Sequence, residues 1–154
     1  MIAERSGHNV LMGISDENET YITFQMTYKE AINALEIAHI RKKECPVVWN
    51  EKIGYWKLLK DMSQQQQCKE FVSKKIDALI QYDKENESDL IETLEALVNH
   101  LGARNITATS LYLHRNTLMY RIKKIENLTG YDLSDPESIL ELSLALRLNK
   151  FMNH

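Results

Sequence analysis

Two short helical segments in the last third of the chain constrain the fold more than any other feature. The segment 107–113 precedes a longer one, 114–128, in which Leu118, Ile122 and Ile125 recur at spacings of four and three. This spacing places the three side chains on one face of a helix, where they can be buried. The sequence therefore predicts two consecutive helices that pack through a shared apolar core.

The first helix and the turn are expected to contribute to the same core. Ala108 is small enough to permit a close crossing of the two helices, and Leu111 and Leu113 are expected to fill the core of the turn. Tyr112 stands where many such turns carry glycine, so the turn need not take a left-handed residue at this position.

The outer face of the second helix is polar and basic. Asparagine can pair with the major-groove edge of adenine, lysine neutralises phosphates, and a tyrosine hydroxyl can bind a phosphate oxygen. The pattern indicates a helix-turn-helix that inserts helix 114–128 into the major groove of double-stranded DNA. The residues predicted to contact DNA are Arg115, Asn116, Thr117, Met119, Tyr120, Lys123, Lys124 and Asn127.

Several residues of this helix also fit structural roles. Asn116 and Thr117 could satisfy backbone groups of the first turn, and Tyr120 could be a half-buried packing residue. His114 fits the N-cap of the helix better than it fits a base contact. The sequence alone leaves these alternatives open.

Charge is distributed unevenly along the chain. Residues 101–130 carry five basic side chains and one acidic side chain, a net charge of +4. The net charge of the full chain is −3, so the rest of the chain carries −7. A basic segment on an acidic protein is typical of a DNA-binding module joined to a part that does not bind DNA. Within the segment, Arg121 fits an ion pair with Glu137 or Glu141 as well as a DNA contact.

The first fifty residues predict a small α/β segment. The apolar runs 10–14 and 47–49 predict strands, and 21–26 predicts either another strand or a loop leading into a helix. Thr27 is expected to cap that helix. Its expected buried residues are Ala31, Ala34, Leu35, Ile37 and Ala38. Two or three strands and a helix do not complete a sheet, so upstream strands or a partner chain are expected to complete it.

Only helices are expected after Ile53. The glutamine run 64–67 predicts a polar joint, and the polar link 84–86 predicts the domain boundary. A helix over 88–101 is expected to bury Leu101 and to end at Gly102. The last helix is expected to begin at Asp135 as N-cap, followed by proline. Its expected buried residues are Ile139, Leu140, Leu142, Leu144, Leu146 and Leu148.

Several functional classes are disfavoured by what the sequence lacks. It has no run of 18 apolar residues and no signal-like start, so we expect no membrane span and a cytoplasmic location. The two cysteines are expected to be reduced, and the histidines show no ligand spacing, so no metal and no cofactor are expected. No paired carboxylates or Ser/Cys–His arrangement stands out, so we expect no catalytic residues and no enzymatic activity.

The run LYLHRNTLMYRIKKIENLTGYDLSDPESILELSLALRL, residues 111–148, closely resembles the C-terminal helix-turn-helix domain of the PucR/CdaR family of bacterial transcriptional regulators. The matching positions are 114–118, 120–121, 128–130 and 144–148. Upstream, TYKEAINALEIAH and GYWKLL resemble the end of the GGDEF-like domain that precedes this module in the family. The chain has no Gly-Gly-Asp/Glu-Glu-Phe sequence, so the resemblance implies no cyclase activity.

The resemblance implies a mainly α protein with a C-terminal helix-turn-helix bundle after a small, incomplete α/β segment. Residues 1–83 would be a truncated GGDEF-like segment with a helical tail, and 84–154 the PucR-type domain. The implied function is sequence-specific regulation of transcription. A homodimer is expected, because one such module contacts few base pairs.

Two further expectations complete the sequence-based account. A small-molecule effector, if there is one, would act through the family's N-terminal region, which has no counterpart in this chain. The alternative function is a dimerisation or protein-interaction module that does not bind DNA independently.

Overall fold

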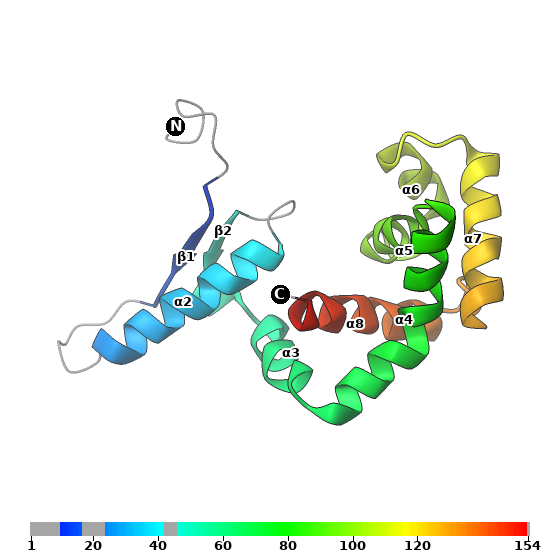
Figure 1. Cartoon of the computed structure of the whole chain (residues 1–154). Helices are drawn as coiled ribbons and strands as arrows, with labels where there is room; N and C mark the ends of the chain where they lie inside the picture. Colours follow the sequence, from blue (N-terminus) through cyan, green and yellow to red (C-terminus); the bar gives the residue numbers. More distant parts are fainter. Residues whose placement is uncertain (1–9, 17–23, 42–45, 154) are drawn as a thin grey trace. The chain divides into compact units, whose positions relative to one another are not determined.

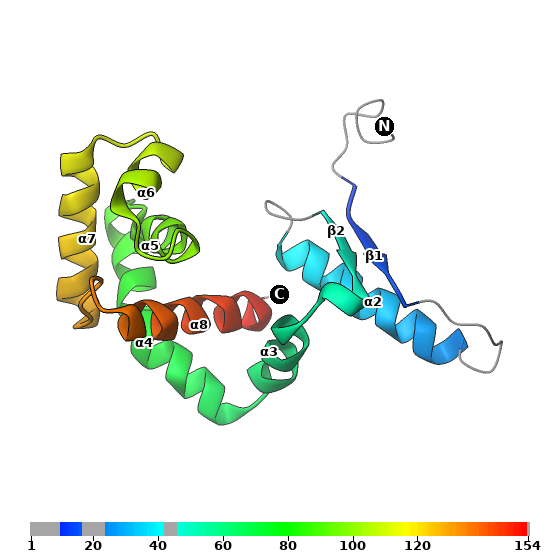
Figure 2. The same ribbon diagram turned by 180° about the vertical axis from the view of Figure 1, so that it is seen from behind.

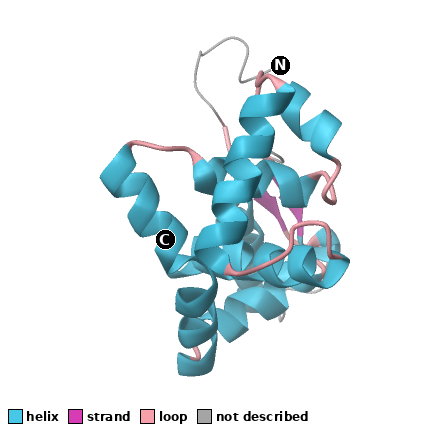
Figure 3. Ribbon diagram, turned by 90° about the vertical axis from the view of Figure 1, so that its right-hand side faces the viewer, coloured by secondary structure: helices cyan, strands magenta, loops and turns pink. Residues whose placement is uncertain are grey.

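Helices make up most of the regular structure, together with two short strands (Figures 1 and 3). The computed structural model describes residues 10–16, 24–41 and 46–153. The chain divides into two compact units, the first reaching Met62 and the second spanning Ser63–Asn153. The predicted mainly α fold with a small α/β segment is confirmed.

The first unit is built on a β-α-β arrangement. Strand β1 (Met12–Ile14) pairs in parallel with β2 (Val47–Trp49), and helix α2 (Phe24–Ile40) connects them. Figure 2 shows the two strands side by side, with α2 along them. The 3-10 turn η2 (Asn50–Lys52) and helix α3 (Tyr55–Ser63) follow. The core of this unit consists of Ala34, Ile37, Ala38, Val48, Ile53, Trp56 and Leu59.

Gly13 permits the close approach of β1 to α2. A Cβ atom at this position would lie 2.3 Å from the Ala31 carbonyl oxygen and 2.2 Å from the Leu35 amide nitrogen. Contacts this short with backbone atoms require the helix to move, so the strand can pack here only without a side chain. The glycine that interrupts the apolar run of the strand therefore has a packing role.

Two expectations for α2 were wrong. Thr27 lies inside the helix, which already includes Phe24, so Thr27 is not the N-cap. Leu35 is 39% exposed, because the buried stripe follows Ala34, Ile37 and Ala38. The expectation of a strand or loop over 21–26 is replaced by helix at 24–26, and residues 21–23 lie outside the described part of the chain.

The second unit is a five-helix bundle. It contains α4 (Gln66–Asn86), α5 (Leu90–Asn99), α6 (Arg104–Ser110), α7 (Arg115–Thr129) and α8 (Pro136–Met152). Helix α4 packs on α5, α7 and α8, and α5 packs on α6, α7 and α8. The largest fully buried side chains of this bundle are Ile76, Leu79, Leu94, Leu97, Leu118, Ile122, Ile125, Leu133, Leu142 and Leu148.

The joint between α4 and α5 is not a linker. Helix α4 continues through the polar residues 84–86, where the domain boundary was expected. The Asp83 carboxylate accepts hydrogen bonds from the amides of Leu90 at 2.9 Å and Ile91 at 2.8 Å, and from the Ser88 hydroxyl. It thereby caps the start of α5, and the compact unit begins at Ser63 instead of at residue 84.

The ends of α5 and α8 differ in part from expectation. Leu101 lies beyond the end of α5, has φ of +51° and is 87% exposed, so it does not join the leucine core. In α8, Leu140 is 61% exposed and Leu144 is half-buried. The N-cap of α8 is as predicted, since the Asp135 side chain accepts from the Glu137 and Ser138 amides.

Candidate nucleic-acid interface

Helices α6 and α7 pack as a helix-turn-helix. Leu118, Ile122 and Ile125 of α7 face inward and are at most 1% exposed. Ala108 of α6 is also buried at the crossing of the two helices. Leu111 and Leu113 are half-buried, so the turn lies closer to solvent than the sequence led us to expect.

The turn between the two helices contains a left-handed residue. Tyr112 has φ of +54°, so the turn takes a left-handed residue here although the sequence did not require one. This conformation reverses the chain so that the Leu113 amide donates to the Ala108 carbonyl at 2.9 Å. The tyrosine side chain is left almost fully in solvent.

The first turn of α7 is capped by His114. Its Nδ1 atom accepts a hydrogen bond from the Asn116 amide at 3.2 Å, which supports the N-cap interpretation over a base contact. The side chains of Asn116 and Thr117 are exposed and form no hydrogen bond with the described part of the chain. Capping therefore uses the backbone amide of Asn116 and leaves its side-chain amide without a partner among the described residues.

Polar side chains form a continuous stripe along the outer face of α7. We call Asn116, Tyr120, Lys123 and Asn127 the outer stripe, and all four are exposed. Tyr120 is 69% exposed, so it is not the half-buried packing residue considered as an alternative. Arg115 is exposed at the start of the helix. The stripe offers hydrogen-bond donors and acceptors and positive charge on one solvent-facing surface.

Lys124 lies apart from the outer stripe. Its ammonium nitrogen is 4.4 Å from the ring centroid of Tyr82 in α4, and the side chain is half-buried. Consecutive helical residues are about 100° apart, so Lys123 and Lys124 face different surroundings. Met119 is also half-buried, with its sulfur 4.0 Å from Nη1 of Arg104.

Arg121 is engaged by helix α5. Its guanidinium donates to the Asp89 carboxylate at 2.9 Å and to the Thr93 hydroxyl at 3.0 Å. The expected partners in α8 were therefore wrong, although the interpretation as an ion pair was correct. Glu141 instead accepts from Lys75 of α4 and from Tyr131.

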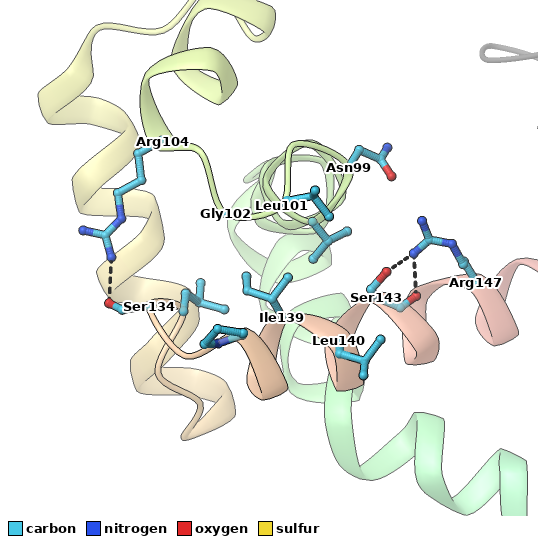
Figure 4. Close-up of a pocket in the computed structure, with 12 residues that line it drawn as sticks. Asn99, Leu101, Gly102, Arg104, Ser134, Ile139, Leu140, Ser143 and Arg147 are labelled. Carbon is cyan, nitrogen blue, oxygen red and sulfur yellow. Dashed lines mark hydrogen bonds between the residues drawn. The ribbon is translucent and has the colours of Figure 1, made fainter.

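Two hollows border the helix-turn-helix. The first, about 750 Å³, lies beside α7. It is lined by Arg104, Met119, Tyr120, Ile122, Lys123, Glu126, Asn127, Gly130, Tyr131, Asp132 and Ser134. The second, about 680 Å³, lies where α5 and its C-terminal loop meet α8 (Figure 4). Arg104 lines both hollows, so its guanidinium lies at the border between them.

The comparison with known families agrees with this geometry. Residues 90–148, which comprise α5, α6, α7 and most of α8, match the family described as "PucR C-terminal helix-turn-helix domain". Over these residues the chain is similar to a PucR-type helix-turn-helix domain. The similar segment ends within the last helix and starts at Leu90, whose amide is bound by Asp83.

Two longer regulators are similar to nearly the whole chain, and a third is similar to less than half of it. The "Proline-responsive transcriptional activator PutR" of Bacillus subtilis is 30% identical over 92% of this chain and 34% of its own length. The "Purine catabolism regulatory protein" of the same organism is 30% identical over 94% of this chain and 27% of its own length. The "Carbohydrate diacid regulator" of Escherichia coli is 39% identical over 43% of this chain and 17% of its own. The chain thus spans about a third or less of these relatives.

The described residues contain neither a metal-binding group nor a membrane-spanning helix. No group of three or more His, Cys, Asp or Glu side chains in that part of the chain is arranged to hold a metal ion. No helix in the same residues is both long and apolar enough to cross a bilayer. The thiol of Cys68 is free and buried, and Cys45 lies outside the described residues.

Proposed function

We propose that this protein is a sequence-specific DNA-binding regulator of transcription that inserts α7 into the major groove. The observation that carries the proposal is the outer stripe: four polar side chains face solvent on α7, while Leu118, Ile122 and Ile125 hold its opposite face in the core. A helix anchored on one side and polar on the other can enter a groove without unfolding the domain.

Each residue of the proposed surface has a chemical role. Asn116 and Asn127 can each donate and accept, which suits the paired groups on the major-groove edge of adenine. Lys123 and Arg115 supply charge for phosphates or, for Arg115 in the first turn, for guanine. Tyr120 can donate its hydroxyl to a phosphate, and Thr117 can do the same at the helix start. Lys124 and Met119, half-buried, are proposed to support the surface from the side.

We also propose that the regulator acts as a homodimer on two half-sites. One helix-turn-helix contacts too few base pairs to select a site in a genome. The first unit offers an apolar surface for association: Met12 and Val47, paired in register, are both at least 40% exposed, as is Trp49 at the end of β2. Burial of such a surface would favour association.

The first unit is proposed to be the end of a GGDEF-like domain. Its parallel β-α-β arrangement is compatible with such an α/β layer, and the similarity to the longer regulators extends through it. Any effector response would then depend on regions present in those longer relatives. No catalytic role is proposed for this unit.

A protein-interaction module without independent DNA binding is the second candidate. The observation that favours it is the loss of two cations from the surface, since Arg121 pairs with Asp89 and Lys124 packs on Tyr82. Leu101 and Leu140 line the second hollow and are exposed, so they also favour a surface that binds protein. This candidate predicts no preference for any DNA sequence.

Fluorescence anisotropy distinguishes the two candidates. The full chain is titrated onto a labelled duplex from upstream of its own gene and onto a scrambled duplex of equal composition, at low and moderate salt. A regulator binds the native duplex more tightly at both salt concentrations. Equal binding to both duplexes, or none, would favour the interaction module.

A further inference from the structure

Arg104 is a cation beside the outer stripe that sequence reasoning did not assign to DNA. We propose that Arg104 binds a phosphate of the DNA backbone next to α7, held in place by Ser134. This inference rests on the proposed function and adds a contact from outside the recognition helix. It identifies the ligand group as a single backbone phosphate and not a base.

The position of Arg104 follows from the order of the helices. It is the first residue of α6, the helix that precedes the recognition helix. In helix-turn-helix domains this first helix crosses the DNA backbone while the second enters the groove. Arg104 lines the hollow beside α7 together with Tyr120, Lys123 and Asn127 of the outer stripe. A phosphate next to the stripe would therefore lie within reach of the guanidinium.

The guanidinium is oriented but not neutralised. Nη2 donates to the Ser134 hydroxyl at 3.1 Å, and Nη1 lies 4.0 Å from the Met119 sulfur. Both partners are uncharged, and Arg104 forms no ion pair with a carboxylate of the described residues. A guanidinium has five N–H donors, so several remain available for a bidentate contact with phosphate oxygens.

Two carboxylates also line this hollow, and both bind backbone amides. Glu126 accepts from the Leu133 amide at 3.1 Å, and Asp132 accepts from the Ser134 amide at 2.7 Å. These bonds tie them to the loop between α7 and α8, which also positions Ser134. Amides of the loop thus bind both carboxylates, Glu126 of α7 and Asp132 of the loop itself, while the Ser134 hydroxyl accepts from Arg104.

Figure 4 shows a second arginine, Arg147, whose substitution serves as a matched control. Arg104 reaches toward Ser134, whereas Arg147 of α8 turns to Ser143 one helical turn earlier, where it donates to the carbonyl at 3.2 Å. Arg147 is likewise half-buried, but it lines only the second of the two hollows. Arg104→Gln and Arg147→Gln therefore remove the same charge from two different places.

The test measures affinity of the full chain for native and scrambled duplexes over a series of salt concentrations. Arg104→Gln is expected to weaken both complexes by the same factor and to reduce the slope of log K against log salt by about 0.9 for each bound protomer, the value for one phosphate. Arg104→Lys should restore much of that slope. Arg147→Gln should leave slope and affinity unchanged, and thermal melts should show that all variants are folded.

Each outcome decides a separate question. If Arg104→Gln keeps the wild-type slope while remaining folded, the phosphate contact is wrong and the proposed regulator stands. If Arg104→Gln changes the preference for native over scrambled duplex, Arg104 contacts a base, and the proposal is again overturned. If the wild-type chain binds no DNA at all, both the contact and the proposed function fail. Ser134→Ala, which leaves the charge in place, should weaken binding less than Arg104→Gln.

Discussion

Lys123 and Lys124 are adjacent in sequence but have different surroundings. Lys123 is exposed on the outer stripe, whereas Lys124 lies over the ring of Tyr82. We predict that Lys123→Ala weakens binding to all DNA and lowers the salt slope by about 0.9 for each bound protomer. Lys124→Ala should instead leave the slope unchanged and reduce the free energy of unfolding by about 0.5–1 kcal/mol, since it removes a cation–π contact.

Salt titrations and urea unfolding of the two variants check this pair, and each variant is the control for the other. Equal changes in slope would mean that both lysines contact phosphate, and Tyr82 would then have no role in holding Lys124 away from DNA.

Asn116 carries the prediction about base recognition. Its side-chain amide has no partner among the described residues, because His114 caps the helix through the backbone amide of Asn116. Asn116→Ala should cost about 1–3 kcal/mol on the preferred duplex and almost nothing on a scrambled one, as expected for loss of one bidentate base contact. Anisotropy titrations on both duplexes measure the difference. A uniform loss on both would assign Asn116 to the backbone of DNA instead of a base.

At the scale of helices, the joint between α4 and α5 depends on Asp83. This carboxylate accepts two amides at the start of α5, where the residue at the N-cap itself, Asp89, forms no capping bond. Asp83→Ala should therefore lower the free energy of unfolding by about 1 kcal/mol, the usual effect of losing a cap. Urea unfolding measures it, with Lys69→Ala, an exposed change in α4, as the control. An unchanged midpoint for Asp83→Ala would show that the amides find other partners.

The start of α8 predicts a dependence of stability on pH. Hydrogen bonds from the Ser138 hydroxyl and amide, and from the Glu137 amide, hold the pKa of Asp135 below its ordinary value. A lowered pKa in the folded state means that the carboxylate stabilises the fold above the ordinary Asp pKa of about 3.9. That stabilisation is lost as the pH falls through the folded-state pKa.

Thermal unfolding of wild type and Asp135→Asn from pH 7 to pH 3 measures this contribution. The wild-type chain should have the higher midpoint near neutral pH, and the difference should shrink as the solution becomes acidic. A difference that stays constant over this range would show that the charge of Asp135 does not contribute.

Features that are determined by residues close in the sequence could be predicted, whereas features that depend on distant helices could not. The amphipathic pattern of 114–128, the Asp135 cap and the break at the glutamine run are set by nearby residues, and all three were predicted. The partner of Arg121, by contrast, depends on which helices cross beside α7. A helical wheel gives the direction of a side chain but not the helix it meets.

Other features that were not predicted also depend on the path of the backbone or on the packing of neighbouring elements. The cap that Asp83 supplies to α5 was not predicted, because a carboxylate that caps the next helix cannot be recognised without the path of the joint. Tyr112 and Leu101 adopt positive φ although neither is glycine, because the hydrogen bonds around each turn fix the backbone. The role of Gly13 follows from the distance between β1 and α2, which no pattern within the strand contains.

The whole chain combines the second unit, which is similar over residues 90–148 to a PucR-type domain, with the first unit. The domain supplies the surface proposed to recognise DNA, and the first unit supplies exposed apolar side chains on a two-stranded sheet in the described part of the chain. If the chain dimerises, a bound site should contain two half-sites about one helical turn, roughly 10 base pairs, or a multiple of it apart. The spacing between half-sites therefore tests whether the whole chain binds DNA as a dimer.

The central claim is that the outer stripe of α7 recognises a DNA sequence. The most direct test is selection by the full chain from a pool of randomised duplexes at moderate salt, followed by sequencing of the bound fraction, for wild type and Asn116→Ala. We predict a recurring motif for the wild-type chain and loss of preference at one position of each half-site for the variant. A bound fraction with the same sequence composition as the starting pool would contradict the claim.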